Sequence, residues 1–161
     1  MGELAGWERA NWFAENDQEK EYKYSWKRQN WFKNSATEHQ AIRENIGVYD
    51  MSSFGKIRVE GSDACKFLNY VAGAECDVPI GKIVYTQFLN NEGGIEADVT
   101  VTRLSENSYI VVTPAATRLA DQTWMMRCAL NYNVAIIDIT AGEGVLAIMG
   151  PNSRKFLNQI C

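Results

Sequence analysis

Within the predicted strand 95–104, residues 95–102 alternate between apolar and polar side chains, which restricts this segment to an extended strand with two different faces. Successive side chains of a strand point to opposite sides of the sheet, so one side enters a core and the other stays polar. The set that we expect to be buried is Ile95, Ala97, Val99 and Val101. The polar set is Glu96, Asp98, Thr100 and Thr102.

The neighbouring segments extend this strand into an antiparallel sheet. Residues 83–89 are rich in β-formers, and Asn-Asn-Glu-Gly-Gly at 90–94 predicts a hairpin turn between the two strands. A second turn leads to a strand over 109–112. Basic and apolar residues alternate over 56–59, which predicts another strand with one solvent-exposed face. We expect a further hairpin that pairs 134–139 with 145–149, across a glycine-containing turn.

Helical patterns alternate with these strands. A helix is predicted to begin at Ser35, which has Glu38 at capping-box spacing, and to run to about Ile46. The clearest amphipathic stripe is Ala64, Phe67, Leu68 and Val71. Thr113 and Pro114 predict a helix start, with the helix ending near Leu130. A last helix after Pro151 is expected to carry Phe156, Leu157 and Ile160 inward.

Hairpins mixed with helices predict an α+β fold with a largely antiparallel sheet and packed helices. Residues 1–34 differ from this region, because they hold four of the five tryptophans without any helix or strand period. We expect 1–34 to be an aromatic-rich linker arm that packs on another surface, and 35–161 to be the folded domain. The chain stops on the last helix, so we expect a partial protein.

Charge and composition exclude several classes of function. The chain has 16 basic and 20 acidic residues and a net charge of -4, so we expect no nucleic-acid partner. It has no apolar run of about 18 residues, so we expect no membrane partner. The four cysteines form no CxxC pair and His39 is the single histidine, so no metal site is expected. A start without signal-peptide character predicts a cytoplasmic location.

Asp98 is the residue that the pattern leaves least explained. Aspartate is a poor strand former, yet Asp98 stands in the middle of the strand, on the polar face between Glu96 and Thr100. A solvated strand face explains it, and so does a surface that a ligand covers. Tyr85, on the partner strand, is either a core tyrosine or part of such a ligand surface.

Four stretches resemble the folate-binding region shared by the glycine-cleavage T-protein (aminomethyltransferase) and the dimethylglycine and sarcosine dehydrogenases. They are Gly-Val-Tyr-Asp-Met-Ser-Ser-Phe-Gly-Lys at 47–56, Tyr-Thr-Gln-Phe-Leu-Asn at 85–90, Gly-Gly-Ile-Glu-Ala-Asp-Val-Thr-Val at 93–101, and Gly-Pro at 150–151. In addition, Gly-Trp-Glu-Arg-Ala-Asn-Trp-Phe at 6–13 is similar to the segment that joins the flavin half to the folate half of the dehydrogenases.

The resemblance implies a tetrahydrofolate site in which Asp98 is catalytic. Asp98 would contact the pterin and assist proton removal as a folate nitrogen attacks a one-carbon iminium, and its charge would stabilise that cation. Tyr85 would form a wall of the pterin cavity, and Met51 and Phe54 match positions near the folate. Phe54 replaces a methionine and Ser53 a histidine of the T-protein pattern.

The resemblance covers only the first part of the folate-binding domain, so we expect an incomplete T-protein-like domain. We expect a fragment of a flavin-linked dimethylglycine or sarcosine dehydrogenase-like protein that captures formaldehyde equivalents from a methylated amine. FAD is expected only in the missing part of the parent enzyme, and the fragment is expected to be inactive alone. The surface left by truncation is expected to cause self-association.

Two alternatives remain open at this point. One is a non-catalytic interaction module that resembles the regulatory subunit of pyruvate dehydrogenase phosphatase, since 50–54 and Asp-Val-Pro-Ile-Gly at 77–81 fit that protein as well. The other is a stand-alone aminomethyltransferase, against which the arm at 1–34 argues.

Overall fold

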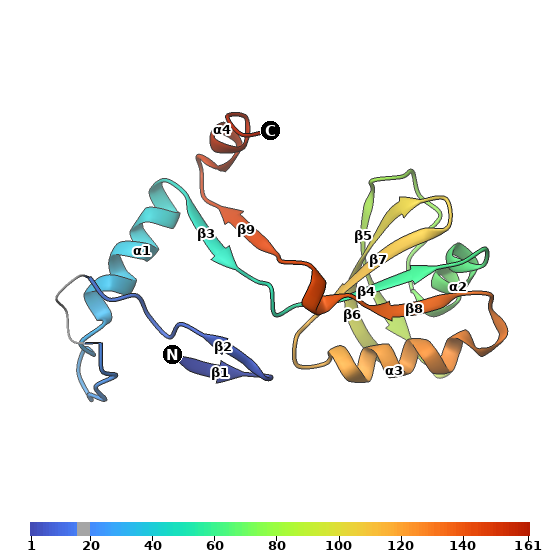
Figure 1. Ribbon diagram of the computed structural model, residues 1–161, viewed down its shortest axis with the longest axis horizontal. Helices are drawn as coiled ribbons and strands as arrows, with labels where there is room; N and C mark the ends of the chain where they lie inside the picture. The colour runs from blue at the N-terminus through green and yellow to red at the C-terminus, as the bar shows by residue number, and fades with distance from the viewer. Residues whose placement is uncertain (16–19) are drawn as a thin grey trace. The chain divides into compact units, whose positions relative to one another are not determined.

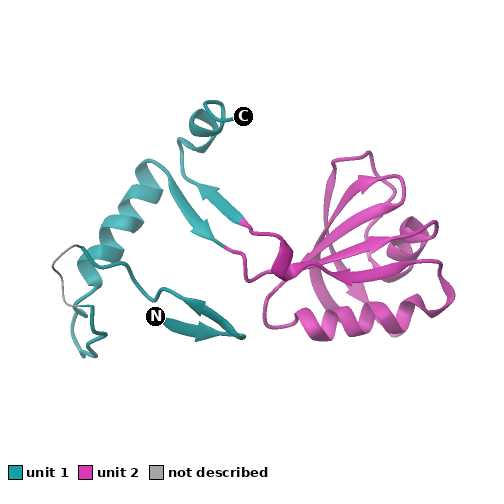
Figure 2. Ribbon diagram, viewed as in Figure 1, with its two compact units in different colours: residues 1–50, 146–161 teal, residues 51–145 magenta. Residues whose placement is uncertain are grey.

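The chain forms two compact units. The computed structural model describes residues 1–15 and 20–161 (Figure 1), so four residues of the predicted arm, 16–19, lie outside the described residues. Unit 1 joins Met1–Asp50 to Leu146–Cys161, and unit 2 is Met51–Val145 (Figure 2). All four residues proposed for the folate site belong to unit 2.

Unit 2 is a five-stranded antiparallel sheet with two helices on one of its faces. The strand order is β5-β6-β7-β4-β8, and every neighbouring pair is antiparallel. The strands are β4 (Gly55–Glu60), β5 (Ile83–Leu89), β6 (Ile95–Ser105), β7 (Ser108–Thr113) and β8 (Ala135–Asp138). The helices are α2 (Ala64–Val71) and α3 (Arg118–Cys128), and short 3-10 turns follow as η1 (Ala129–Asn131) and η2 (Thr140–Gly142). This arrangement confirms the predicted α+β class.

The core of unit 2 lies between the helices and the inner face of the sheet. The apolar stripe of α2, consisting of Ala64, Phe67, Leu68 and Val71, is buried as predicted. From β6 the core receives Ala97, Val99 and Val101. Ile95 was also expected to be buried, but 69% of its surface is exposed. It is the first residue of the strand, directly after the turn, and it follows the irregular pairing of the two strands at Leu89.

The start of α3 differs from the prediction. The helix begins at Arg118, after a turn at Pro114, while Thr113 is still the last residue of β7. The hydroxyl of Thr113 donates to the buried Asp121 carboxylate, which also accepts a 2.8 Å hydrogen bond from Thr117 Oγ1. Thr113 therefore ties the strand to the first turn of the helix instead of capping it.

The predicted hairpin between 134–139 and 145–149 was wrong. β8 pairs with β4 in unit 2, whereas β9 (Leu146–Met149) pairs with β3 (Gly47–Asp50) in unit 1. The chain turns away after β8 because Thr140 donates its backbone N–H to Asp138 Oδ1 at 2.9 Å and enters η2. Its hydroxyl also accepts the Lys56 N–H at 3.0 Å, which fixes this turn beside β4.

Unit 1 contains small elements and little buried surface. They are the antiparallel strands β1 (Gly2–Leu4) and β2 (Trp7–Arg9), helix α1 (Phe32–Glu44), the pair β3 and β9, and helix α4 (Ser153–Leu157). The predicted arm is thus partly structured, and α1 begins three residues before the expected Ser35. Tyr22 lies 6.0 Å from the ring of Trp31, but Trp26 is fully exposed.

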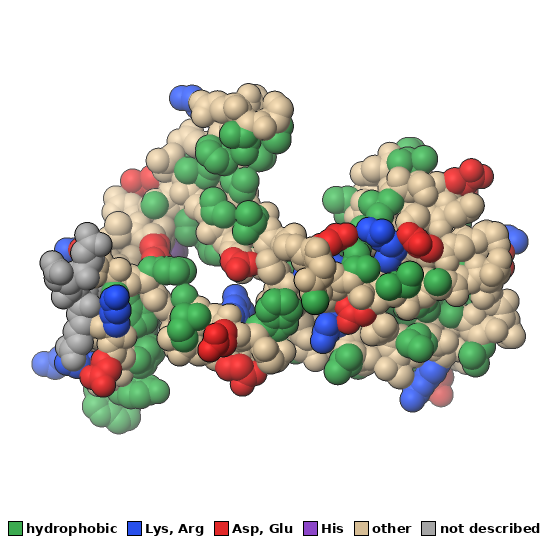
Figure 3. All heavy atoms as spheres, viewed as in Figure 1, with side chains coloured by type: hydrophobic (Ala, Val, Ile, Leu, Met, Phe, Trp, Pro, Cys, Tyr) green, Lys and Arg blue, Asp and Glu red, His purple; other side chains and the backbone are tan. Residues whose placement is uncertain are grey.

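The apolar residues of α4 do not enter a core. Phe156 and Leu157 are each 37% exposed and Ile160 is 63% exposed, so the inward packing expected for them is wrong. The physical reason is that the buried hydrophobic side chains of the described residues all belong to unit 2. Figure 3 shows apolar side chains on the surface over β9 and α4. Among residues 1–15 and 20–161, no helix is both long and apolar enough to cross a membrane.

Candidate functional site

Asp98 and Tyr85 lie together on the outer face of the unit 2 sheet, the face opposite the helices. Asp98 pairs directly with Gln87 in the β5–β6 ladder, and Tyr85 pairs with Thr100, two residues further along. Side chains that are directly opposite or diagonal in an antiparallel pair are within reach of each other when they are long. The register therefore brings Tyr85, Gln87 and Asp98 to one point of the surface.

Each oxygen of the Asp98 carboxylate accepts a hydrogen bond from the neighbouring strand. The Tyr85 hydroxyl donates to Oδ2 at 2.7 Å, and Gln87 Nε2 donates to Oδ1 at 3.0 Å. An ionised carboxylate can accept about four hydrogen bonds. Asp98 therefore keeps acceptor capacity for a ligand that supplies N–H groups.

Tyr85 is held in its protonated form by the same contact. Its hydrogen bond to Asp98 raises the pKa of the phenol, because ionisation would remove the donor and place a second negative charge beside the carboxylate. Desolvation and the Asp98 charge add to this effect, while a hydrogen bond with Gln87 acts in the opposite direction and lowers the pKa. Tyr85 is thus a hydrogen-bond donor to Asp98 over the whole neutral range.

The inner face of the sheet fixes the outward direction of these side chains. On β5 the alternate residues Thr86 and Phe88 are buried, and on β6 Ala97 and Val99 are buried. A slip of one residue would put Asp98 into the core, so burial of these four residues specifies the register.

The turn beside the site is also fixed by side chains. Asn90 Oδ1 accepts the backbone N–H groups of Glu92 at 3.0 Å and Gly94 at 2.8 Å. Gly93 has a φ of 79°, which glycine adopts without strain. The two strands therefore leave the turn in a defined register.

Met51 and Phe54 lie before a different strand from the one that carries Asp98. Both are half-buried in the turn before β4, where the Phe54 N–H donates to the Met51 carbonyl at 3.0 Å. Asp98 is on β6, and one strand, β7, separates β6 from β4. At the usual spacing of strands β4 and β6 are about 10 Å apart, so a ligand that reaches from Asp98 to this turn must extend across β7.

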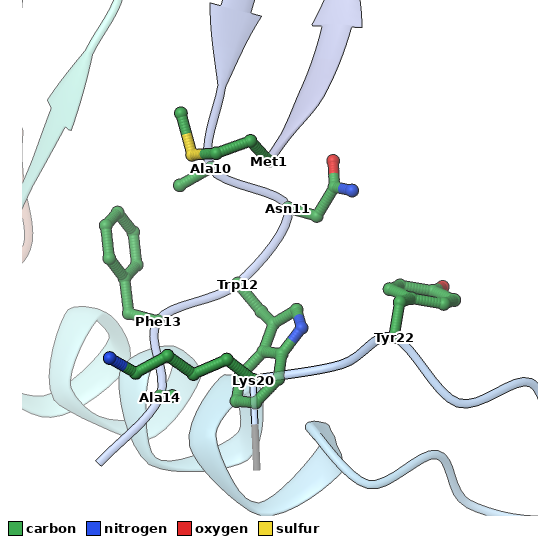
Figure 4. Close-up of a pocket in the computed structure, with 8 residues that line it drawn as sticks. All are labelled: Met1, Ala10, Asn11, Trp12, Phe13, Ala14, Lys20 and Tyr22. Atoms are coloured by element: carbon green, nitrogen blue, oxygen red, sulfur yellow. The ribbon is translucent and has the colours of Figure 1, made fainter. Parts of the chain in front are cut away.

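The Asp98 surface is open. Tyr85 is 65% exposed and Asp98 is exposed as well, so the two residues form one wall. A hollow of about 600 Å³ lies in unit 1, lined in part by Trp12, Phe13 and Tyr22 (Figure 4). Within residues 1–15 and 20–161, no cluster of three or more His, Cys, Asp or Glu side chains could hold a metal ion.

Gln87 is the site residue that sequence reasoning missed. Its position two residues after Tyr85 places it on the same face of a predicted strand, so alternation could have identified it. Its contact with Asp98 depends on the strand register, which the hairpin turn and the bulge between Phe88 and Leu89 set together.

The fold and this surface define an α+β domain whose antiparallel sheet is covered on one face and open on the other. The whole chain, residues 1–161, matches the family model described as the GCVT N-terminal domain. The chain therefore belongs to the GCVT N-terminal domain family, which confirms the T-protein-like resemblance.

Two relatives are much longer proteins than this chain. The chain is 42% identical to the 4-methylaminobutanoate oxidase (formaldehyde-forming) of Paenarthrobacter nicotinovorans over 160 residues, which are 99% of this chain and 19% of the oxidase. It is 34% identical to the aminomethyltransferase of Staphylococcus epidermidis over 124 residues, which are 76% of this chain and 34% of that enzyme. This chain thus spans a minor part of both relatives.

Solved structures share the fold. The glycine cleavage system aminomethyltransferase T from Bartonella henselae matches with a TM-score of 0.71 and 30% identity, over 76% of this chain and 34% of that one. The heterotetrameric sarcosine oxidase from Corynebacterium sp. U-96 matches with a TM-score of 0.56 over 81% of this chain and 64% of that one. At 14% identity, the second match shows the fold alone.

Proposed function

We propose that this chain is part of a longer flavin-linked enzyme of the dimethylglycine or sarcosine dehydrogenase type, and that it contributes one wall of a tetrahydrofolate site. The observation that carries the proposal is the Asp98 carboxylate, held on an open sheet face between the Tyr85 hydroxyl and the Gln87 amide. Tetrahydrofolate would supply the nucleophilic nitrogen that takes up the one-carbon unit released from a methylated amine. FAD would belong to the remainder of the parent enzyme.

The residues present fit a reduced pterin. The free acceptor positions of Asp98 suit the N–H groups of the pteridine, and the exposed Tyr85 ring offers an apolar surface beside them. A flat ligand over this wall would remove water from the carboxylate, which favours proton uptake by Asp98. Its negative charge would also stabilise a cationic one-carbon donor.

The coverage of the relatives favours an oxidase-type parent over a stand-alone aminomethyltransferase. The oxidase match includes 99% of the chain, whereas the aminomethyltransferase match includes 76%. The complete reading frame tests this part of the proposal. A frame that encodes no flavin-binding region would contradict it.

The folate part is tested by an NMR titration of the 161-residue chain with 5-formyltetrahydrofolate. Because one wall supplies only some of the contacts, we expect weak binding, with chemical-shift changes concentrated in β5 and β6. Asp98→Asn should weaken this binding by about tenfold, the cost of one charge-assisted hydrogen bond. The control Glu92→Gln makes the same chemical change in the exposed turn and should bind as the wild type does.

Two results would contradict the folate site. One is the absence of shift changes in β5 and β6 at millimolar ligand, which would favour a non-catalytic interaction module like the phosphatase regulatory subunit. The other is equal affinity in the wild type and Asp98→Asn.

The proposal also includes self-association of the isolated chain. Unit 1 exposes apolar side chains on both strands of its β3–β9 sheet, with Val48 at 59% and Leu146 at 69% exposure. Exposed apolar surface and unpaired strand edges both favour association between copies.

A further inference from the structure

We infer that Gln87 is a positioning residue, which holds the Asp98 carboxylate in the one orientation that receives the reduced folate. This inference rests on the proposed function of Asp98. It assigns a role to a side chain that contacts Asp98 from the opposite strand and that the family resemblance did not single out.

The geometry restrains the carboxylate at both oxygens. Asp98 is exposed, so core packing does not select its rotamer. The Tyr85 hydroxyl alone holds Oδ2 and would leave the carboxylate free to rotate about that contact. The Gln87 amide holds Oδ1 at 3.0 Å, and the two donors together define the plane of the carboxylate.

The chemistry of Gln87 suits positioning and not proton transfer. A carboxylate only accepts hydrogen bonds, so the NH₂ group of the Gln87 amide must face Asp98 and its carbonyl must point elsewhere. A primary amide does not exchange its proton as an acid in the neutral range. Gln87 therefore orients Asp98 and takes no part in proton transfer. The carboxylate of Asp98 and the phenol of Tyr85 are the two acidic groups of this site.

The backbone around Gln87 is fixed. Its neighbours Thr86 and Phe88 are 2% and 0% exposed, and the Thr86 hydroxyl accepts the Ala74 backbone N–H at 3.1 Å. Gln87 is thus presented from a rigid strand, which a positioning side chain requires. Because its Cα lies directly opposite that of Asp98, the amide reaches the carboxylate without a change of backbone.

The inference is tested first in the ligand-free chain with two variants. Gln87→Glu keeps the shape of the side chain and replaces the donor by an acceptor, and Gln87→Leu removes polarity. In both, the Hα–Hβ couplings of Asp98 should change from those of one rotamer to those of a rotamer average. In Gln87→Leu the phenol of Tyr85 should titrate at higher pH than in the wild type, because the opposing hydrogen bond from Gln87 is gone. A role limited to folding would move neither readout in a folded variant.

The second measurement is binding of 5-formyltetrahydrofolate. We expect roughly tenfold weaker binding in both Gln87 variants. The control Asn91→Asp makes an amide-to-acid change in the adjacent turn and should leave the couplings and the affinity unchanged. Gln87→Glu also serves as the isosteric variant if Gln87→Leu does not fold.

The outcomes separate the two claims. Unchanged Asp98 couplings in both folded Gln87 variants would overturn the positioning role, whether or not the ligand binds. Changed couplings with an unchanged affinity would also overturn it, because the orientation would then have no effect on the ligand. A wild-type chain that binds no 5-formyltetrahydrofolate would instead refute the proposed function.

Discussion

At the scale of single residues, the candidate site consists of Asp98 and the two side chains that donate hydrogen bonds to it, Tyr85 and Gln87. Aspartate is unfavourable in the middle of a strand, and the structure provides two cross-strand donors for it. A solvated strand face needs no such donors. The arrangement therefore supports a role for Asp98 that goes beyond the polarity of an exposed sheet surface.

The coupling between Asp98 and Tyr85 makes a prediction about pH. In Asp98→Asn the negative charge and the strong acceptor are lost, so the pKa of Tyr85 should fall from its raised value toward the ordinary value for tyrosine. NMR of chains labelled at the tyrosine Cζ measures this titration, with Tyr24 as an internal reference. A Tyr85 pKa that rises or stays constant would show that the contact with Asp98 does not form.

Asp98 could be singled out from the sequence, whereas its partners could not all be found. Alternation placed Asp98 on the outer face, and the resemblance added Tyr85. The distance between Met51 and Asp98 depends on the strand order β5-β6-β7-β4-β8, which no local pattern contains. For that reason the sequence could not show that β7 lies between β6, which carries Asp98, and β4, which follows Met51 and Phe54.

At the scale of elements, the segments with strong local patterns were predicted well. β5 has the predicted bounds, Ile83–Leu89, and α2 buries all four residues of its apolar stripe. The pairing of β8 and β9 was missed because both segments look like strands of one hairpin. Their true partners, β4 and β3, lie far away in the sequence.

Helix α2 makes a prediction about stability. Phe67 is fully buried, and its ring lies 5.7 Å from that of Tyr132 in an edge-on contact. Phe67→Ala should lower the free energy of unfolding of unit 2 by about 3–5 kcal/mol, because it leaves a cavity in the core. Urea denaturation measures this change.

Lys66 on the same helix supplies the control for Phe67→Ala. Its side chain is 78% exposed and forms an ion pair with the nearby Asp63. Lys66→Ala should change the free energy of unfolding by less than about 1 kcal/mol. Equal effects of the two substitutions would mean that α2 does not pack on the sheet.

At the scale of the whole molecule, the two units differ in how complete they are. Unit 2 has a core that closes between a sheet and two helices. Unit 1 contains Asn34 as the single buried residue among its described residues. A two-stranded sheet without a core is only marginally stable in water. Contacts with other polypeptide should therefore stabilise unit 1 more than unit 2.

This difference predicts concentration-dependent association. Light scattering should show a mass above that of a monomer at high protein concentration, and Leu146→Lys should reduce it by placing a charge on the edge strand β9. The control Leu130→Lys changes a residue of unit 2 that is 84% exposed and should not reduce association. A monomeric wild type at all concentrations would contradict the prediction.

The central claim is that a reduced pterin binds on the outer face of unit 2, beside Asp98. The most direct measurement is the set of intermolecular nuclear Overhauser effects between 5-formyltetrahydrofolate and the labelled chain. We predict contacts from the pteridine protons to the ring of Tyr85 and to the side chains of β6. Contacts confined to the aromatic hollow of unit 1, around Trp12 and Tyr22, would contradict the account.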